Sequence, residues 1–361
     1  AYLETLNGDF ARADKNFDKA ESKMPKTLLA IRQLRLLRFV NNLSKIDHLN
    51  PSNEKTILKD LSWLYFELPK EIVEDFRYGN ASKWSRDYLS ALYHSQNNKI
   101  LSELFVRKSG FYDNEKDLLA MKSFLSKPNK TGLEEIAGKV YELKLKDIVA
   151  YQAVKATFAN RIPEAIALMQ QSGSKNGVLL GNPFNGNIKD CHDCEHLAHQ
   201  KKKYTQIEFL NVIKTMQDNI EKKVDVYTNA ILLGNAFYNI SHFGNARTFY
   251  EGNIFGFGSS PYEFNGGAKA MITDCSVAQS YYSQALANAR TKEEKAKCHY
   301  MLAKCERNQY YNKKYYAVRH WWEIADDKIN FLAWSGFKAL KKEYSDTKYY
   351  QEVLAECGYF K

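Results

Sequence analysis

The feature that most constrains the fold is a recurring pattern of small and aromatic residues at helical spacing. Ala13, Phe17 and Ala20 are separated by four and then three residues, which places them on one face of a helix. The small side chains let a neighbouring helix approach, and the ring fills the space between. Gly8 permits a tight turn before this helix, and Pro25 ends it. The segment therefore predicts one helix of a closely packed pair.

The same pattern returns in the C-terminal part of the chain. Leu233, Gly234 and Phe237 are expected on one helix, with Ala246 and Tyr250 on the next. Further copies of the second-helix pattern are Ala278, Tyr282 and Ala285, then Ala317, Trp321 and Ile324, and a degenerate copy contains Ala165 and Met169. The intervals from Ala246 to Ala278 and from Ala278 to Ala317 are 32 and 39 residues, and they bracket a period of about 34.

This order of residues resembles the tetratricopeptide repeat over residues 8–25 and 227–325. The resemblance implies an all-α fold, an α-solenoid of antiparallel helix pairs, interrupted by two long irregular loops near residues 171–190 and 252–267. Amphipathic helices are expected at residues 27–45, 54–66 and 132–142, the last with a capping box formed by Thr131 and Glu134.

Three regions follow from these patterns. Residues 1–130 form an N-terminal helical-repeat region, residues 131–205 contain helices and an irregular Cys-x-x-Cys loop, and residues 206–361 contain the C-terminal repeats. Long loops inside a compact array are often functional, so the two irregular loops are the first places to look for a site.

A candidate metal site lies beside the first loop. Cys191 and Cys194 have the spacing of two zinc ligands, and His196 or His199 would supply a third. Glu195 stands where a c-type haem motif requires histidine, which excludes that cofactor. Three alternatives stay open: one structural zinc ion, a Cys191–Cys194 disulfide, or two reduced thiols with no cofactor.

The second loop combines five glycines with aromatic residues. Phe255, Phe257 and Tyr262 either fill a gap between repeats or form a contact surface for a partner. Trp322 is a further candidate contact, because adjacent tryptophans on a helix cannot both face the core. No lysine followed by serine or threonine comes after Gly256-Phe257-Gly258, so a phosphate-binding loop is not expected.

The charge balance gives little support to a nucleic-acid partner. The chain has 52 basic and 42 acidic residues, a net charge of +10, but the basic residues are dispersed and no base-reading motif is found. Arg32, Arg35 and Arg38 would form a cationic helix face opposite Leu28, Ile31 and Leu34, either solvated or in contact with an acidic partner or a membrane surface. The mean hydropathy is −0.53, and no apolar run reaches the length of about 18 residues that a membrane span needs.

The motifs of common hydrolases, kinases and P-loop enzymes are not found in the sequence. The expected function is therefore a non-enzymatic protein-binding scaffold, or an accessory subunit of a larger assembly, with other protein subunits as partners. The alternative is an enzyme or ligand-binding protein with a metal or small-molecule site near loops 171–199 and 252–267.

Three features bear on location. A disulfide between Cys191 and Cys194 would form in an oxidising compartment such as the cell envelope. The chain begins at Ala1 without an initiator Met, so we expect a processed or truncated N-terminus and an unknown targeting signal. Residues 341–350 predict a helix end, a short turn and a new helix, and they are similar to inter-repeat turns of tetratricopeptide lipoproteins in bacterial outer-membrane assembly machines. That resemblance implies the cell envelope, periplasmic or outer-membrane-associated, with the cytoplasm as the alternative.

Overall fold

The protein is helical throughout the part of the chain that the structure describes. The computed structural model describes residues 1–69, 76–173, 177–188, 202–257, 260–316, 318, 320 and 334–356. In these ranges the extended pairings are limited to two isolated bridges, Val178 with Thr205 and Gly252 with Gly256. The predicted all-α class is confirmed at this level.

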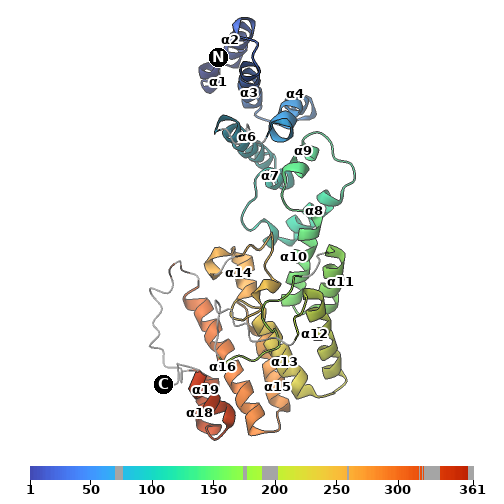
Figure 1. The fold of residues 1–361 in the computed structure, drawn as a ribbon, viewed down its shortest axis with the longest axis vertical. Coiled ribbons are helices and arrows are strands. Elements are labelled where there is room, and N and C mark those ends of the chain that lie inside the picture. Colours follow the sequence, from blue (N-terminus) through green and yellow to red (C-terminus); the bar gives the residue numbers. More distant parts are fainter. Residues whose placement is uncertain are drawn as a thin grey trace. The chain divides into compact units, whose positions relative to one another are not determined.

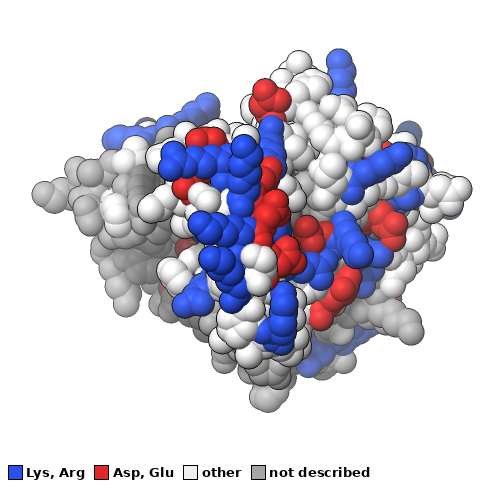
Figure 2. All heavy atoms as spheres, turned by 90° about the horizontal axis from the view of Figure 1, so that it is seen from above, with Lys and Arg blue, Asp and Glu red and all other residues white. Residues whose placement is uncertain are grey.

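The chain packs into two compact units, Ala1–Lys144 and Leu145–Lys361. Basic residues slightly outnumber acidic ones in both, with 24 against 20 in the first unit and 28 against 22 in the second. On the face drawn in Figure 2, the described Lys and Arg side chains are interspersed with Asp and Glu side chains. The positive net charge is therefore distributed between the units.

The first unit contains the helices predicted from amphipathic spacing. Its elements are α1 (Tyr2–Leu6), α2 (Phe10–Lys23), α3 (Leu28–Ser44), α4 (Pro51–Ser62) with a π-helical turn (Trp63–Glu67), α6 (Phe76–Ser95), α7 (Lys99–Phe105), a 3-10 turn (Phe111–Asp113), α8 (Glu115–Ser126) and α9 (Leu133–Val140) (Figure 1). Thr27 caps α3 by accepting a hydrogen bond from the Ala30 amide. The predicted box before α9 is half formed, because Glu134 accepts from the Thr131 amide while Gly132 is the N-cap residue.

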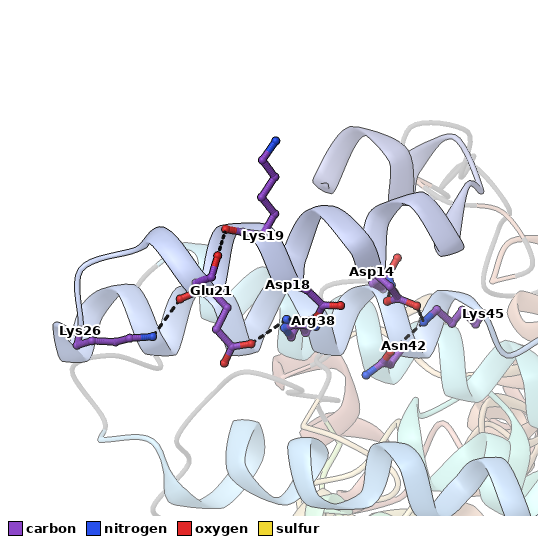
Figure 3. A network of polar contacts seen from close by, with 10 residues as sticks. Asp14, Asp18, Lys19, Glu21, Lys26, Arg38, Asn42 and Lys45 are labelled. Carbon is purple, nitrogen blue, oxygen red and sulfur yellow. Dashed lines mark hydrogen bonds and ion pairs between the residues drawn. The ribbon is translucent and has the colours of Figure 1, made fainter.

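Helices α2 and α3 pack through an apolar centre and a charged end. Ala13 and Phe17 are fully buried as predicted, but Ala20 is exposed, which corrects the expected contact there. Charged side chains make the contact at that end, where Arg38 donates to Asp18 at 2.7 Å and to Glu21 at 2.9 Å (Figure 3).

The predicted cationic face of α3 is also corrected. Arg35 and Arg38 do not form a free solvated surface, because Arg35 pairs with Asp60 at 2.8 Å and Arg38 pairs with α2. The opposite stripe is not buried along its whole length, since Leu28 and Ile31 are exposed. These arginines join α3 to its two neighbours.

The second unit contains an extended core that runs from α10 to α19 and a smaller cluster of Ala230, Ala285 and Cys298. Its elements are α10 (Leu145–Phe158), α11 (Ile162–Ser172), α12 (Gln206–Glu221), α13 (Val226–Asn239), 3-10 turns (Arg247–Phe249 and Pro261–Glu263), α14 (Gly266–Ile272), α15 (Ser276–Asn288), α16 (Lys292–Lys314), α18 (Ser335–Glu343) and α19 (Lys348–Glu356) (Figure 1). Each long helix from α10 to α13 packs on the next one along the chain. Helix α13 then packs on α15, α15 packs on α16, and α16 packs on α18. Packing between sequence neighbours is what a repeat array requires, and the solenoid of antiparallel pairs stays a prediction.

The pair α13 and α15 contains the predicted small and aromatic residues. Leu233, Gly234 and Phe237 are buried on α13, facing α15 with its buried Ala278, Tyr282 and Ala285. A Cβ atom on Gly234 would lie 2.4 Å from the Tyr282 ring, so only glycine allows this approach without a rearrangement. The predicted packing role of these residues is confirmed.

The prediction that Ala246 and Tyr250 lie on a second helix is wrong. They flank the 3-10 turn Arg247–Phe249, and α15 takes the position beside α13 instead. The chain folds back on itself directly after α13, where a Cβ atom on Gly244 would lie 2.1 Å from the Asn239 Cα. Residues 240–275 therefore form an insertion between the two partners of one helix pair.

The last helices follow the predicted tail geometry. Helix α18 ends at Glu343, a short turn follows, and α19 begins at Lys348. Glu306 on α16 accepts hydrogen bonds from the Ser335 amide at 3.1 Å and from the Ser335 hydroxyl at 2.9 Å. This carboxylate stabilises the start of α18.

Candidate chain-binding face of the second unit

Five polar side chains of α13 and α16 are buried on one face of the second unit. They are Asn235 and Asn239 on α13, and Tyr300, Lys304 and Asn308 on α16. The spacing of four residues within each helix places them in two rows. Their exposed fractions are between 1% and 6%. Buried polar groups at this density need hydrogen-bond partners, so the partners indicate what this face holds.

The partners of four of them are main-chain carbonyl groups of residues 183–188. Asn239 Nδ2 donates to the Pro183 oxygen at 3.0 Å and to the Asn185 oxygen at 2.7 Å. Asn235 Nδ2 donates to the Phe184 oxygen at 3.0 Å. The carbonyl oxygens of Asn187 and Ile188 accept from Lys304 Nζ and Tyr300 Oη, each at 2.8 Å. We call residues 182–188 the inner segment.

The donors are themselves fixed by hydrogen bonds and ring contacts. Tyr282 Oη donates to Asn235 Oδ1 at 2.9 Å, which orients the amide so that its nitrogen points to the inner segment. Asn308 Nδ2 donates to the Tyr238 hydroxyl at 2.8 Å. Lys304 Nζ lies 4.8 Å from the centre of the Tyr238 ring, a cation–π contact in a buried setting. These orienting contacts come from α13, α15 and α16 and not from the inner segment.

Two apolar side chains anchor the inner segment. Phe184 contacts the rings of Tyr204 and Phe209, with centroids 5.2 Å and 5.6 Å apart, and Ile188 is 7% exposed. Gly186 lies against the Asn235 amide, where a Cβ atom would be 3.3 Å from Nδ2. The segment is held mainly through its backbone, with side-chain contacts at two positions.

This face was not among the predicted site residues. The signal that could have found it is polar residues at spacing of four on helices whose other inward positions are apolar. The predicted irregular loop near residues 171–190 does contain the inner segment, although Gln171 and Ser172 belong to α11. The sequence indicated the turn residues of the inner segment, but it did not indicate that the segment is buried.

The predicted metal or disulfide site lies outside the described residues. Cys191, Cys194, His196 and His199 are all in the range 189–201, so the zinc and disulfide alternatives stay predictions. Within the described ranges, no group of three or more His, Cys, Asp or Glu side chains is arranged to hold a metal ion.

The second irregular loop, residues 252–267, contains both a ring that fills a gap and a ring that is exposed for contact. Phe255 is half-buried and packs against Tyr151, with ring centroids 4.7 Å apart, so it fills a gap. Phe257 is 72% exposed, and Tyr262 is half-buried. Trp322, the fourth predicted contact residue, lies outside the described part of the chain. Of the three described candidates, Phe257 has the exposure that a contact surface requires.

A cavity beside this loop bears on the small-molecule alternative. Tyr151, Met169, Gln206, Tyr250 and Phe255 are among the residues that line it, and its volume is about 200 Å³. Ligand pockets for drug-sized molecules usually span about 300–1,000 Å³. A larger cavity of about 690 Å³ lies away from both loops, at the turn before α13 and the start of α16. Among the described residues, the cavity beside the second loop is therefore smaller than a usual pocket for a drug-sized ligand.

The first unit contains a buried carboxylate that the sequence did not indicate. Glu103 on α7 is 1% exposed, accepts from the Lys108 amide at 2.7 Å and from Tyr141 Oη at 3.2 Å. Burial raises the pKa of Glu103 to about 7, and these two hydrogen bonds oppose the rise. The Glu103 carboxyl group can therefore hold a proton near neutral pH.

Comparison of the chain with protein-family models, with curated proteins and with solved structures gives no significant match. Among the described helices, none combines the length and the apolar character needed to cross a bilayer.

Proposed function

We propose that this protein is a non-enzymatic scaffold that binds polypeptide chains, acting as an accessory subunit of a larger assembly in the cell envelope. The observation that supports the binding role is the face of α13 and α16, whose buried side chains donate to five main-chain carbonyl groups of a non-helical segment. A surface built to hold backbone is suited to protein ligands, because every peptide carries the same acceptors.

The energetics favour an occupied face. A buried donor left without a partner costs about 1–3 kcal/mol, whereas a made hydrogen bond contributes about 1 kcal/mol. Five such bonds converge here from four side chains. The array therefore requires a chain on this face, and it binds one through groups that do not depend on the sequence of that chain.

A second contact surface is proposed at the aromatic loop. Phe257 exposes most of its ring at the end of the Gly252–Gly256 bridge. Large aromatic side chains concentrate binding energy at protein interfaces. We propose that Phe257 contacts a partner subunit directly.

The test is purification of the protein from its native source with a mild cross-linker and an affinity tag. We expect a stoichiometric partner, with cross-links that map to the second unit. Phe257→Ala should reduce recovery of the partner at least tenfold, whereas Val224→Ala, which truncates another exposed apolar residue, should leave it unchanged. A chain recovered alone with and without cross-linker would contradict the scaffold role.

The envelope location is supported by the resemblance of residues 341–350 to turns of envelope lipoproteins. Cell fractionation tests it directly. Recovery with periplasmic or outer-membrane material supports the location, and recovery with the cytoplasmic fraction contradicts it while leaving the binding role intact.

A further inference from the structure

The inner segment is bound as a ligand would be bound. It follows α11 and precedes α12 in the chain, yet its carbonyl groups pair with side chains 51 to 117 residues further on. The contacts to its backbone come from side chains of α13 and α16, and the contacts to its Phe184 ring come from Tyr204 and Phe209. Helix α15 packs directly on both α13 and α16.

We propose that the inner segment occupies, within the same chain, a binding site that accepts a non-helical segment of a partner protein in its place, with a turn like the one that the Asn185 amide closes by donating to the Asn182 oxygen. The partner segment would carry an aromatic residue at the position of Phe184 and an aliphatic residue four positions later, at the position of Ile188. This inference rests on the proposed scaffold function and names the ligand of its chain-binding face.

Exchange is physically reasonable because it conserves the polar contacts. An incoming backbone offers the same carbonyl acceptors to Asn235, Asn239, Tyr300 and Lys304, so no donor stays unpaired when the exchange is complete. Spontaneous release is different, since it would leave those donors buried without their acceptors. The segment should therefore leave only when another chain replaces it.

The covalent connection of the inner segment sets the affinity that a competitor experiences. A tethered ligand acts at an effective concentration in the millimolar range for a short flexible link. A free peptide with the same contacts must compete against that concentration, and its apparent affinity is reduced accordingly. Weakening the internal segment should therefore raise the affinity for a peptide added in trans.

The experiment uses the full-length protein and a labelled peptide with blocked ends and the sequence Gly-Asn-Pro-Phe-Asn-Gly-Asn-Ile, which reproduces residues 181–188. Fluorescence anisotropy measures its binding. The variant Phe184→Ala removes the internal aromatic anchor, and we expect it to bind the peptide at least tenfold more tightly than the wild type. A peptide with alanine in place of phenylalanine should lose this binding.

Two further variants identify the site. Asn239→Ala, added to Phe184→Ala, removes the donor of two hydrogen bonds, and peptide binding should weaken at least tenfold. Phe76→Ala, which removes an exposed ring in the first unit, should bind the peptide as the wild type does. Circular dichroism confirms that each variant keeps its helix content.

If Phe184→Ala does not fold, Ile188→Ala removes the other apolar anchor more mildly. It should also bind the peptide more tightly than the wild type does.

The proposal is overturned if the folded Phe184→Ala and Ile188→Ala variants bind the peptide no more tightly than the wild type. Dimers of these variants that increase with protein concentration would assign the site to a second copy of this chain, and would also overturn the proposed partner. If a partner still co-purifies in either case, the proposed scaffold function is retained. Failure of the segment exchange is therefore distinguishable from failure of the scaffold function.

Discussion

Glu103 is a single residue whose ionisation couples pH to the stability of the first unit. Its pKa is raised to about 7 by burial, against 4.5 for an exposed glutamate. Between these values the folded state retains a proton that the unfolded chain has lost. The free energy of unfolding should therefore fall as the pH rises from about 4.5 to 7, by at most about 3 kcal/mol from this group.

The variant Glu103→Gln tests this dependence. Its amide can accept from the Lys108 amide and donate to the Tyr141 hydroxyl, so the neutral state is retained at all pH values. We expect urea unfolding of the variant to lack this fall in stability and to exceed the wild type above pH 7. Glu142→Gln, which removes an exposed carboxylate of the same unit, should keep the wild-type slope, and a wild-type slope in Glu103→Gln would refute the assignment.

At the scale of elements, the contact between α13 and α15 depends on a missing side chain. Alanine at Gly234 would place Cβ 2.4 Å from the buried Tyr282 ring, which is also fixed by its hydrogen bond to Asn235. Overpacking of this kind costs about 1–3 kcal/mol, and the gain in helix propensity returns only about 1 kcal/mol. We expect Gly234→Ala to lower the free energy of unfolding, by up to about 2 kcal/mol.

A glycine with open space around it provides the matched control. At Gly266, the first residue of α14, a Cβ atom would have no described atom of another residue within 4 Å beyond its chain neighbours and its own helix. Gly266→Ala should therefore be neutral or slightly stabilising, by less than about 1 kcal/mol. Chemical denaturation of the two variants measures the contrast, and equal stabilities would show that Tyr282 moves aside without cost.

The helices could be predicted where local spacing decides them. Ala13 with Phe17, and Ala278 with Tyr282, lie on buried helix faces as their spacing indicates. Ala246 and Tyr250 show the same spacing without forming a helix, because the close packing at Gly244 turns the chain back. A pattern of two residues cannot distinguish these cases, since the deciding contact is made with the preceding helix.

At the scale of the whole molecule, the candidate site combines segments that are far apart in the sequence. The carbonyl oxygen of Asn187 and the ammonium group of Lys304 meet across 117 positions. Sequence spacing reports neighbours on one helix, and it carries no information about which loop covers that helix. The buried polar residues of α13 and α16 could therefore be recognised from the sequence as unusual positions. The inner segment that they bind could not be predicted from it.

The division into two compact units predicts how the stability effects are distributed. Units that each contain their own core open as separate cooperative regions. At pH 8, Glu103→Gln should slow amide hydrogen exchange in α7 and α9, and Gly234→Ala should accelerate it in α13 and α15. Mass spectrometry of the double variant should give the sum of the two patterns, with coupling below about 0.5 kcal/mol. Faster exchange in α7 or α9 of Gly234→Ala would instead mean that the units open together, and stability would then be a property of the whole chain.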